Sequence, residues 1–492
     1  MTTATDPDPV WDLVVVGGGT AGLVGAKAAA SFGARVLLVE ADRLGGECLW
    51  TGCVPSKALL AAAAAAAGAR NAGRLGVRVS SVEVDFAAVM RRVHEAMATI
   101  APADSAEALQ AAGVSVLSGY AVFAGPDTVT VDGVTVRFRQ ALLATGSMPT
   151  MPTMPTVPGL DDADALTSDT VWDLTTRPDR LTVLGGGSIG CELGQAFARL
   201  GSTVTVVEAG DRLLPGEDPT AAALVEQALV ADGVDVVTGT SAAMVQPDDT
   251  DSTAGVLDLT DGRRVVYDRL LVAVGRRPRT SKLRLDRAGV DVDAHGVVGV
   301  DEHLRTTNPR IWAAGDITGH AQLTHLAGVH ATLAVTNALL GLRRSVEGEV
   351  VPRVTFTHPE VAAVGVRTDR AEVGMRVLTW DHAHVDRAVA DADVVGFSRL
   401  VVDRRGRVVG ATLVGPRAGE SLAEVVLAVR HRLRTRDLAG STHAYPTYGD
   451  GAWNAAIADV RAGLRRPAAA RAVGAASGMR RAWLGARDRL GR

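Results

Sequence analysis

One structural pattern occurs twice in this chain, and it limits the possible fold more than any other feature of the sequence. Each copy contains a short apolar strand, a glycine-rich turn, a helix and a second strand that ends in an acid. The first copy starts at residues 12–16 and ends at Glu40, and the second starts at 181–184 and ends at Glu208. Elements in this order form a parallel βαβ unit. The sequence therefore predicts an α/β protein with two Rossmann-like dinucleotide-binding domains.

The turn in each copy has the glycine spacing that binds a pyrophosphate. Its glycines are Gly17, Gly19 and Gly22 in the first copy, and Gly185, Gly187 and Gly190 in the second. Glycine is needed because the turn is tight and a side chain would keep a phosphate away from the backbone N–H groups. The acid after each turn is expected to bind ribose hydroxyls. Two such units predict two dinucleotides, FAD in the first and a nicotinamide nucleotide, NAD(P)H, in the second.

The acid of the second copy bears on which nicotinamide nucleotide is used. Glu208 favours NADH, because a carboxylate repels the 2′-phosphate of NADPH. Arg212 lies only four residues further on and weakens that preference.

Composition excludes several other classes of protein. The chain has 492 residues, enough for about three domains, and its formal net charge of −4 gives no reason to expect a nucleic-acid partner. The N-terminus has neither the basic nor the apolar region of a signal peptide, so we expect a cytoplasmic protein. The most apolar run, Ala58–Gly68, is too short to span a bilayer and predicts a buried helix.

Two of the three cysteines, Cys48 and Cys53, lie in a segment that opens a helix. A helix N-terminus stabilises a thiolate, and Lys57 adds a cation four residues after Cys53. Two cysteines are too few for structural zinc, so no metal site is predicted. A structural disulfide is an alternative, but next to two nucleotide sites a redox-active pair is favoured. The third cysteine, Cys191, is expected to be a small packed residue without a redox role.

The pattern of elements divides the chain into parts. A linker rich in Pro, Thr and Met occupies residues 148–159, and alternating strands from about residue 351 predict an α+β domain. The expected parts are a first nucleotide domain at 1–152 and 281–350, a second at 153–280, the α+β domain at 351–463, and a basic tail at 464–492.

Taken together, these motifs resemble the pyridine nucleotide–disulfide oxidoreductases, which include dihydrolipoamide dehydrogenase, glutathione reductase and mercuric reductase. The resemblance runs from about residue 10 to about residue 462. Besides the two turns and the cysteine segment, it includes Glu192, Ala144-Thr145-Gly146, Val274-Gly275-Arg276-Arg277-Pro278, Ala314-Gly315-Asp316 and Phe356-Thr357-His358-Pro359-Glu360.

The resemblance implies roles for individual residues. Cys53 would be the thiol beside the flavin, and Cys48 the interchange thiol that meets the acceptor. Lys57 and Glu192 would pair near the reactive edge of the flavin, and Asp316 would bind its ribityl chain. The motif residues Thr145, Gly146 and Gly275 would belong to the cofactor sites. The α+β domain would form a homodimer in which each chain completes the active site of its partner.

The C-terminal part departs from the disulfide reductases of this family. Those enzymes carry a histidine with a carboxylate five residues later, and by register Tyr445 and Asp450 occupy these places. A phenol, with a pKa near 10, is a poor base at neutral pH. His443 could compensate, but we interpret it as a structural or surface histidine. Mercuric reductases tend to carry a tyrosine here, and Asp386-Arg387-Ala388 resembles them as well.

The acceptor is therefore left unassigned. The chain lacks the extra C-terminal cysteine pair and the N-terminal metal-binding module of mercuric reductases, and Leu49-Trp50-Thr51 differs from all three groups. We interpret it as a mercuric-reductase-like enzyme with a small-molecule or metal-ion acceptor. The alternatives are dihydrolipoamide dehydrogenase or another disulfide reductase, direct reduction of a quinone or oxygen by the flavin, and a redox-sensing flavoprotein.

The tail at 464–492 carries eight arginines and one acid. A basic helix on a membrane surface or an acidic partner is one interpretation. A disordered or solvated tail is the favoured one.

Overall fold

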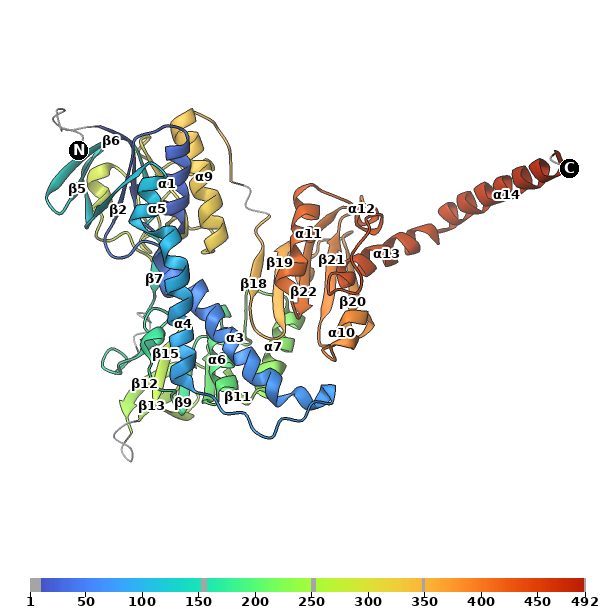
Figure 1. Ribbon diagram of the computed structural model, residues 1–492, viewed down its shortest axis with the longest axis horizontal. Coiled ribbons are helices and arrows are strands. Elements are labelled where there is room, and N and C mark those ends of the chain that lie inside the picture. The colour runs from blue at the N-terminus through green and yellow to red at the C-terminus, as the bar shows by residue number, and fades with distance from the viewer. Residues whose placement is uncertain (1–9, 152–156, 249–253, 347–349, 491–492) are drawn as a thin grey trace. The chain divides into compact units, whose positions relative to one another are not determined.

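A computed structural model describes residues 10–151, 157–248, 254–346 and 350–490 (Figure 1). The chain forms two compact units. Unit 1 comprises Met1–Leu214 and Leu229–Gly348, and unit 2 comprises Pro215–Ala228 and Glu349–Arg492. Both expected nucleotide domains lie mainly in unit 1, and the α+β part lies in unit 2. The expected fold class, α/β with a C-terminal α+β domain, is confirmed.

The first sheet of unit 1 contains the first copy of the repeated pattern. Its strand order is β3-β2-β1-β6-β5-β4, and β17 also pairs with β6. The strands are β1 (Trp11–Val16), β2 (Val36–Glu40), β3 (Val114–Ser118), β4 (Ala121–Gly125), β5 (Thr128–Val131), β6 (Val134–Leu143) and β17 (Ile311–Ala313). β1, β2, β3, β6 and β17 pair in parallel.

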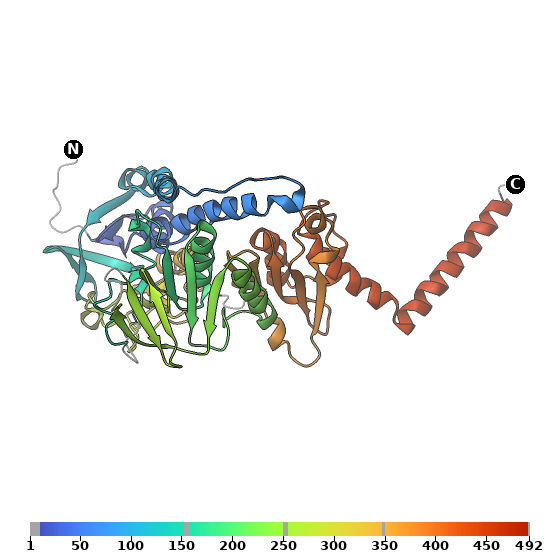
Figure 2. The same ribbon diagram turned by 90° about the horizontal axis from the view of Figure 1, so that it is seen from below.

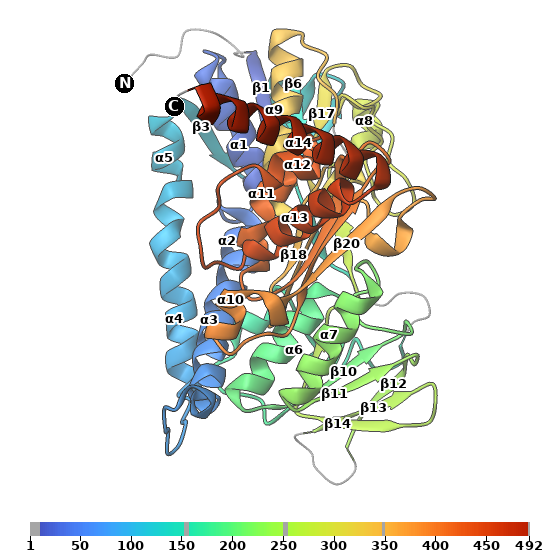
Figure 3. The same ribbon diagram turned by 90° about the vertical axis from the view of Figure 1, so that its right-hand side faces the viewer.

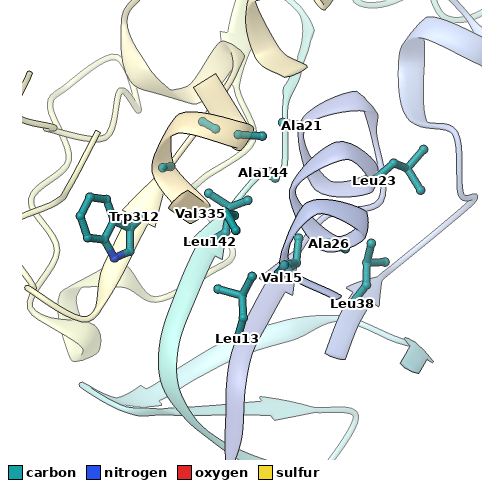
Figure 4. Packing of buried hydrophobic residues seen from close by; sticks show 14 of the residues in the cluster. Leu13, Val15, Ala21, Leu23, Ala26, Leu38, Leu142, Ala144, Trp312 and Val335 are labelled. Carbon is teal, nitrogen blue, oxygen red and sulfur yellow. The ribbon is translucent and has the colours of Figure 1, made fainter. Parts of the chain in front are cut away.

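Both faces of β1 are buried, as a parallel strand requires. Leu13 and Val15 pack on one face with helices α1 (Thr20–Ser31) and α9 (Thr324–Leu340), as Figure 4 shows. Val14 and Val16 pack on the other face in a second buried cluster. The apolar run in the sequence is therefore explained by burial on both sides, and it fixes the position of the turn that follows β1.

The second copy of the pattern forms a second parallel sheet, in the order β11-β10-β9-β15-β8. Its elements are β8 (Leu166–Thr167), β9 (Arg180–Leu184), α6 (Ser188–Leu200), β10 (Thr203–Glu208), β11 (Val234–Thr238) and β15 (Arg269–Val272). An antiparallel sheet of β12 (Ala242–Pro247), β13 (Gly255–Leu259) and β14 (Arg264–Tyr267) follows it. The short strands β7 (Ser147–Pro149) and β16 (Arg276–Pro278) pair where the chain passes between the two nucleotide domains.

The cysteine segment forms two helices, α2 (Gly46–Trp50) and α3 (Cys53–Arg70). α3 packs against α4 (Phe86–Ile100) and α6, and Figure 3 shows α3 and α4 side by side. By length and composition alone, Gly46–Arg70 is the one described stretch that could cross a membrane. In the structure it is interrupted at Thr51–Gly52 and packs within unit 1 through buried side chains such as Leu59 and Ala63. Those contacts are the ones that a helix of a folded domain makes.

Unit 2 contains an antiparallel sheet in the order β18-β19-β22-β21-β20. Its strands are β18 (Arg353–Thr355), β19 (Glu360–Gly365), β20 (Arg376–Asp381), β21 (Phe397–Val402) and β22 (Val408–Gly415). Its helices are α10 (Asp386–Ala390), α11 (Ala418–Arg430), α12 (Thr435–Ala439) and α13 (Asp450–Leu464), and α7 (Pro219–Ala231) begins in this unit. α11 covers β19 and β22 with buried aliphatic side chains.

The basic tail is helical. α14 (Pro467–Leu490) follows α13 after a short break, and the two helices meet at an angle in Figure 2. The favoured expectation of a disordered or solvated tail did not foresee this helix, although its side chains are indeed solvated.

Candidate active site

The two glycine turns have nearly the same conformation. Gly17 and Gly185, which follow the first strand of each copy, both have φ of +108°, a left-handed conformation that favours glycine. A Cβ on Gly22 would lie 1.8 Å from the carbonyl oxygen of Gly17, and one on Gly190 would lie 1.9 Å from that of Gly185. These positions therefore accept only glycine, and each turn leads directly into a helix, α1 or α6. Both are suited to hold a pyrophosphate at a helix N-terminus.

The acid of each copy folds back onto its own turn. Glu208 accepts hydrogen bonds from the backbone N–H of Gly186 at 2.6 Å and of Gly210 at 2.7 Å. Glu40 accepts the equivalent bonds from Gly18 and, at 2.8 Å, from Asp42. Glu40 also lines a cavity of about 890 Å³. The first turn, its acid and this cavity fit the adenosine half of FAD.

The residues expected near the rest of the flavin lie close together. Asp316, at the start of a 3₁₀ turn after β17, accepts a hydrogen bond of 2.5 Å from the hydroxyl of Ser147. Thr145 donates to the carbonyl oxygen of Arg279 at 2.8 Å, and Gly146 has a left-handed φ of +68°. The loop after β6 and the turn after β17 therefore meet, as a shared cofactor site requires, and the residues present fit FAD.

The two cysteines of the predicted redox pair contact each other. Cys48 lies on α2, Cys53 is the first residue of α3, and the two thiols are hydrogen-bonded. Sγ of Cys53 also lies 3.3 Å from Oγ1 of Thr324, the first residue of α9. The remaining cysteine, Cys191, is buried and bonds the carbonyl oxygen of Gly186, which agrees with a packed residue.

The two thiols have different environments, and the difference indicates which of them is ionised in the reduced pair. The hydrogen bond from Cys48 is the largest cause that lowers the pKa of Cys53, to about 6 from its usual 9. The same bond, together with burial, raises the pKa of Cys48. Thr324 and the nearby cation of Lys57 lower the pKa of Cys53 further. In the reduced pair, Cys53 therefore carries the thiolate and Cys48 keeps its proton.

Lys57 and Glu192 form the ion pair that the resemblance implied. Nζ of Lys57 lies 2.8 Å from Oε2 of Glu192, and the glutamate side chain is only 8% exposed. Lys57 is on the cysteine helix α3, whereas Glu192 is on α6 of the second nucleotide domain. The pair links the redox helix to the domain that would hold the nicotinamide.

A second link was missed by the sequence analysis. Glu47, which precedes Cys48, pairs with Arg276, whose Nε also donates to Ser147 at 2.9 Å. Burial, helped by the carboxylates of Asp316 and Asp169, raises the pKa of Glu47 to about 7 even though Arg276 opposes the shift. The available signals were an acid next to a reactive cysteine and an arginine in a recognised motif, but nothing in the sequence paired them.

The C-terminal candidates Tyr445 and Asp450 lie in unit 2, and each has its own hydrogen-bond partner. The hydroxyl of Tyr445 donates to Asp386 at 2.6 Å, and this bond raises the pKa of the phenol. Tyr445 is 68% exposed, whereas Asp450 is 3% exposed and accepts a hydrogen bond from the backbone of Thr447 at 3.1 Å. Asp386, from the segment that resembles mercuric reductases, is therefore the carboxylate that contacts Tyr445.

His443 is held within its own unit. Its Nε2 lies 2.8 Å from a carboxylate oxygen of Glu424, and its ring stacks on Trp453 at 4.9 Å between centroids. These contacts agree with a structural histidine. Across the described residues, no group of three or more His, Cys, Asp or Glu side chains could hold a metal ion.

Comparisons with known proteins match both the nucleotide-binding part and the C-terminal part of the chain. Residues 11–331 match the family described as pyridine nucleotide-disulphide oxidoreductase, and residues 351–456 match the dimerisation domain of that family. A mercuric reductase of Streptomyces lividans is 36% identical over 450 residues, which cover 89% of this chain and 94% of that protein. A dihydrolipoyl dehydrogenase of Geobacillus stearothermophilus is 34% identical over 458 residues, covering 90% and 95%.

A solved structure is also similar over most of its length. LpdA of Mycobacterium tuberculosis superposes with a TM-score of 0.83 at 30% identity, covering 91% of this chain and 99% of that one.

Proposed function

The chain belongs to the pyridine nucleotide-disulphide oxidoreductase family, and we propose that it uses NADH to reduce a thiophilic metal ion, with Hg(II) as the favoured acceptor, through Cys48 and Cys53. It is an FAD-dependent enzyme whose electron donor is a pyridine nucleotide. The observation that carries the proposed acceptor is that Tyr445 and His443, the two C-terminal candidates for a base, are both engaged by hydrogen bonds within unit 2.

NADH is the proposed donor because of Glu208. Its carboxylate is fixed by two backbone N–H groups at the end of β10, where the ribose of a bound nucleotide would lie. A 2′-phosphate at that place would meet a fixed negative charge. Arg212 lies beside Asp211, with 3.7 Å between the charged atoms, so part of its charge is balanced by a neighbouring acid.

Bound FAD would supply two-electron transfer between the nicotinamide and the cysteine pair. NADH and the Cys48–Cys53 disulfide then give NAD⁺, the thiol of Cys48 and the thiolate of Cys53. Cys53 is suited to the flavin side because Thr324 and Lys57 stabilise its thiolate. Cys48 is left as the sulfur that meets the acceptor.

Reduction of a disulfide acceptor would require a base to remove the proton of Cys48. Tyr445 has a pKa above that of a free phenol, because it donates a hydrogen bond to Asp386. His443, the other candidate, is bonded to Glu424 and stacked on Trp453. Tyr445 donates its hydroxyl proton to Asp386, and both ring nitrogens of His443 are engaged within unit 2, Nε2 with Glu424 and Nδ1 with the carbonyl oxygen of Ser441 at 3.0 Å. Neither group therefore offers Cys48 an unengaged base.

A thiophilic metal ion does not need such a base, because a thiol that coordinates the metal becomes acidic enough to release its proton to water. Cys48 would release its proton to solvent on binding Hg(II), and Cys53 would bind as a thiolate. When the metal ion takes up two electrons, the two sulfurs return to the disulfide, so that NADH and Hg(II) give NAD⁺, elemental mercury and one proton overall. The similarity to mercuric reductases supports this acceptor, and the similarity to dihydrolipoyl dehydrogenases makes a disulfide the second candidate.

We also propose that the enzyme is a homodimer. The match of residues 351–456 to a dimerisation domain supports this assembly. In the family, each chain completes the active site of its partner, so Tyr445 would act at the site of the other subunit. Asp450, buried at the start of α13, would keep the loop before it in place through Thr447.

The test is NADH oxidation by the purified holoenzyme with Hg(II), lipoamide, glutathione disulfide and a quinone offered side by side. We expect appreciable turnover with Hg(II) and weak turnover with both disulfides. Fast turnover with lipoamide or glutathione disulfide would contradict the argument from Cys48 and its missing base. Slow oxidation with every acceptor would instead favour a redox sensor.

A matched pair of variants separates the cysteines from the flavin. Cys48→Ser should abolish Hg(II) reduction but leave the reduction of the flavin by NADH intact. Cys191→Ser changes the same atom at a buried site outside the pair and should leave both reactions intact. Quinone reduction that survives Cys48→Ser would show that the flavin also reacts directly with that acceptor.

A further inference from the structure

The helix α14 exposes a surface that none of the proposed chemistry uses. It follows α13, packs against the end of that helix, and extends away from the sheet of unit 2 (Figures 1 and 2). None of its residues with a described side chain is buried. Met479 is 69% exposed and Trp483 is 52% exposed. A helix that buries no face gains little stability from its own unit.

Met479 and Trp483, two of the exposed apolar side chains, share one side of α14, whereas Val473 lies on the other. At about 100° per residue, one sector contains no charged residue and consists of Ala468, Ala472, Ala475, Ala476, Met479, Ala482, Trp483 and Ala486. These positions recur at intervals of three and four, as in an amphipathic helix. We call this sector the apolar face of α14.

Arginines border the apolar face on both sides. Arg471 and Arg489 lie along one edge, and Arg480 and Arg487 along the other. The guanidinium carbons of Arg480 and Arg487 lie 4.2 Å and 5.4 Å from the ring centroid of Trp483. An apolar sector that contains tryptophan and is flanked by cations is typical of a helix that lies in the interface of a bilayer.

The distribution of charge also favours a lipid bilayer as the partner of α14. α14 contains five arginines and one acid, whereas the whole chain has a formal net charge of −4. An anionic surface would therefore attract this helix and repel the remainder of the chain. A nucleic acid would offer the same negative charge, but it would leave the alanine, methionine and tryptophan side chains of the apolar face without an apolar partner.

We propose that α14 docks the enzyme on an anionic lipid bilayer, with the apolar face in the interface and the flanking arginines at the lipid headgroups. The helix lies along the surface, because its sector is only one side of the cylinder and Arg481 and Asp488 occupy the other. This inference goes beyond the proposed redox function and does not depend on the acceptor.

The test is co-sedimentation of the full-length holoenzyme with vesicles of phosphatidylcholine alone or with about 30% phosphatidylglycerol. We expect binding only to the anionic vesicles and a decrease in binding as salt is added. Removal of residues 467–492 should abolish binding. The far-ultraviolet circular dichroism spectrum reports whether each variant is folded, and NADH oxidation in the same samples reports whether the redox residues of unit 1 are intact.

Matched variants test the face rather than the charge alone. Met479→Ala with Trp483→Ala removes two large side chains from the apolar face and should weaken partitioning about tenfold. Val473→Ala with Leu484→Ala removes two from the other side of the same helix and should leave partitioning within about twofold. Arg480→Gln with Arg487→Gln should weaken it by about tenfold or more.

Any of four results would overturn the proposal. The first is binding of the holoenzyme to neutral vesicles as strongly as to anionic ones, or no binding to either kind. Another is equal loss of binding in the two apolar variant pairs. The third is dissociation of the homodimer on removal of residues 467–492, because the apolar face would then belong to a second copy of the chain. Binding to RNA or DNA without binding to anionic vesicles would likewise assign the arginines to a nucleic acid.

Discussion

The hydrogen bond between the two redox cysteines should control how reactive Cys53 is. Cys48→Ala removes the largest single cause that lowers the pKa of Cys53 to about 6. The pKa should then rise towards its usual value of 9, and a rise of two units to about 8 is a reasonable expectation because Lys57 and Thr324 remain. At pH 7 the thiolate fraction would fall from about 90% to about 10%.

The assay is the rate of alkylation of Cys53 by iodoacetamide in the reduced holoenzyme, followed by mass spectrometry between pH 5 and pH 9. Because the thiolate is the reacting species, the rate at pH 7 should fall about ninefold in Cys48→Ala. Cys48→Ser keeps a hydroxyl donor, so its alkylation rate at pH 7 should lie between those of the wild type and Cys48→Ala. Thr324→Val removes one weaker bond, at 3.3 Å, and should shift the midpoint less. An unchanged midpoint in Cys48→Ala would refute the assignment of the thiolate.

Three further predictions concern the cofactor sites, the buried glutamate and the tyrosine. Gly22→Ala should abolish FAD binding, and Gly190→Ala should abolish reduction by NADH but leave FAD bound. In each variant the added Cβ would lie within 2 Å of a carbonyl oxygen of the same turn. Flavin absorbance measures the first effect and titration with NADH the second. The pKa of Glu47 is raised to about 7, so the stability that it contributes is present below its usual pKa and is lost as pH rises to about 7. Glu47→Gln should remove that loss, about 2 kcal/mol of the free energy of unfolding, and a pH dependence like that of the wild type in urea unfolding would contradict it. Tyr445→Phe should leave the shape of the pH profile of Hg(II) reduction between pH 6 and pH 8 unchanged, because the phenol bonded to Asp386 does not titrate there; a lost or shifted limb in that profile would show that Tyr445 is a base.

The features that sequence analysis predicted are those whose chemistry is local. The glycine turns and their acids lie within a few tens of residues of each other, so a strand, a turn and a helix suffice to place them. Lys57 follows Cys53 on the same helix, and its position beside the thiolate follows from helical spacing alone. The pairing of Lys57 with Glu192, across 135 positions, came only from the resemblance.

The features that were missed depend on contacts between distant segments. Glu47 and Arg276 are 229 positions apart, and no spacing rule joins a cysteine helix to a short strand of another sheet. Asp386, the hydrogen-bond partner of Tyr445, is 59 positions away in the sequence, and no spacing rule links the two. The helix α14 contains glycines at 474, 478 and 485, which lower helix propensity, and its alanines outweigh them.

The most direct test of the central claim is the number of reactive thiols before and after reduction by NADH. The oxidised holoenzyme is mixed with one equivalent of NADH without oxygen, alkylated and mapped by mass spectrometry. If electrons pass through the cysteine pair, Cys48 and Cys53 should be unlabelled before NADH and both labelled afterwards, two per chain, while Cys191 stays unlabelled. If the flavin is reduced and neither cysteine becomes reactive, the pair is a structural disulfide and the account is contradicted.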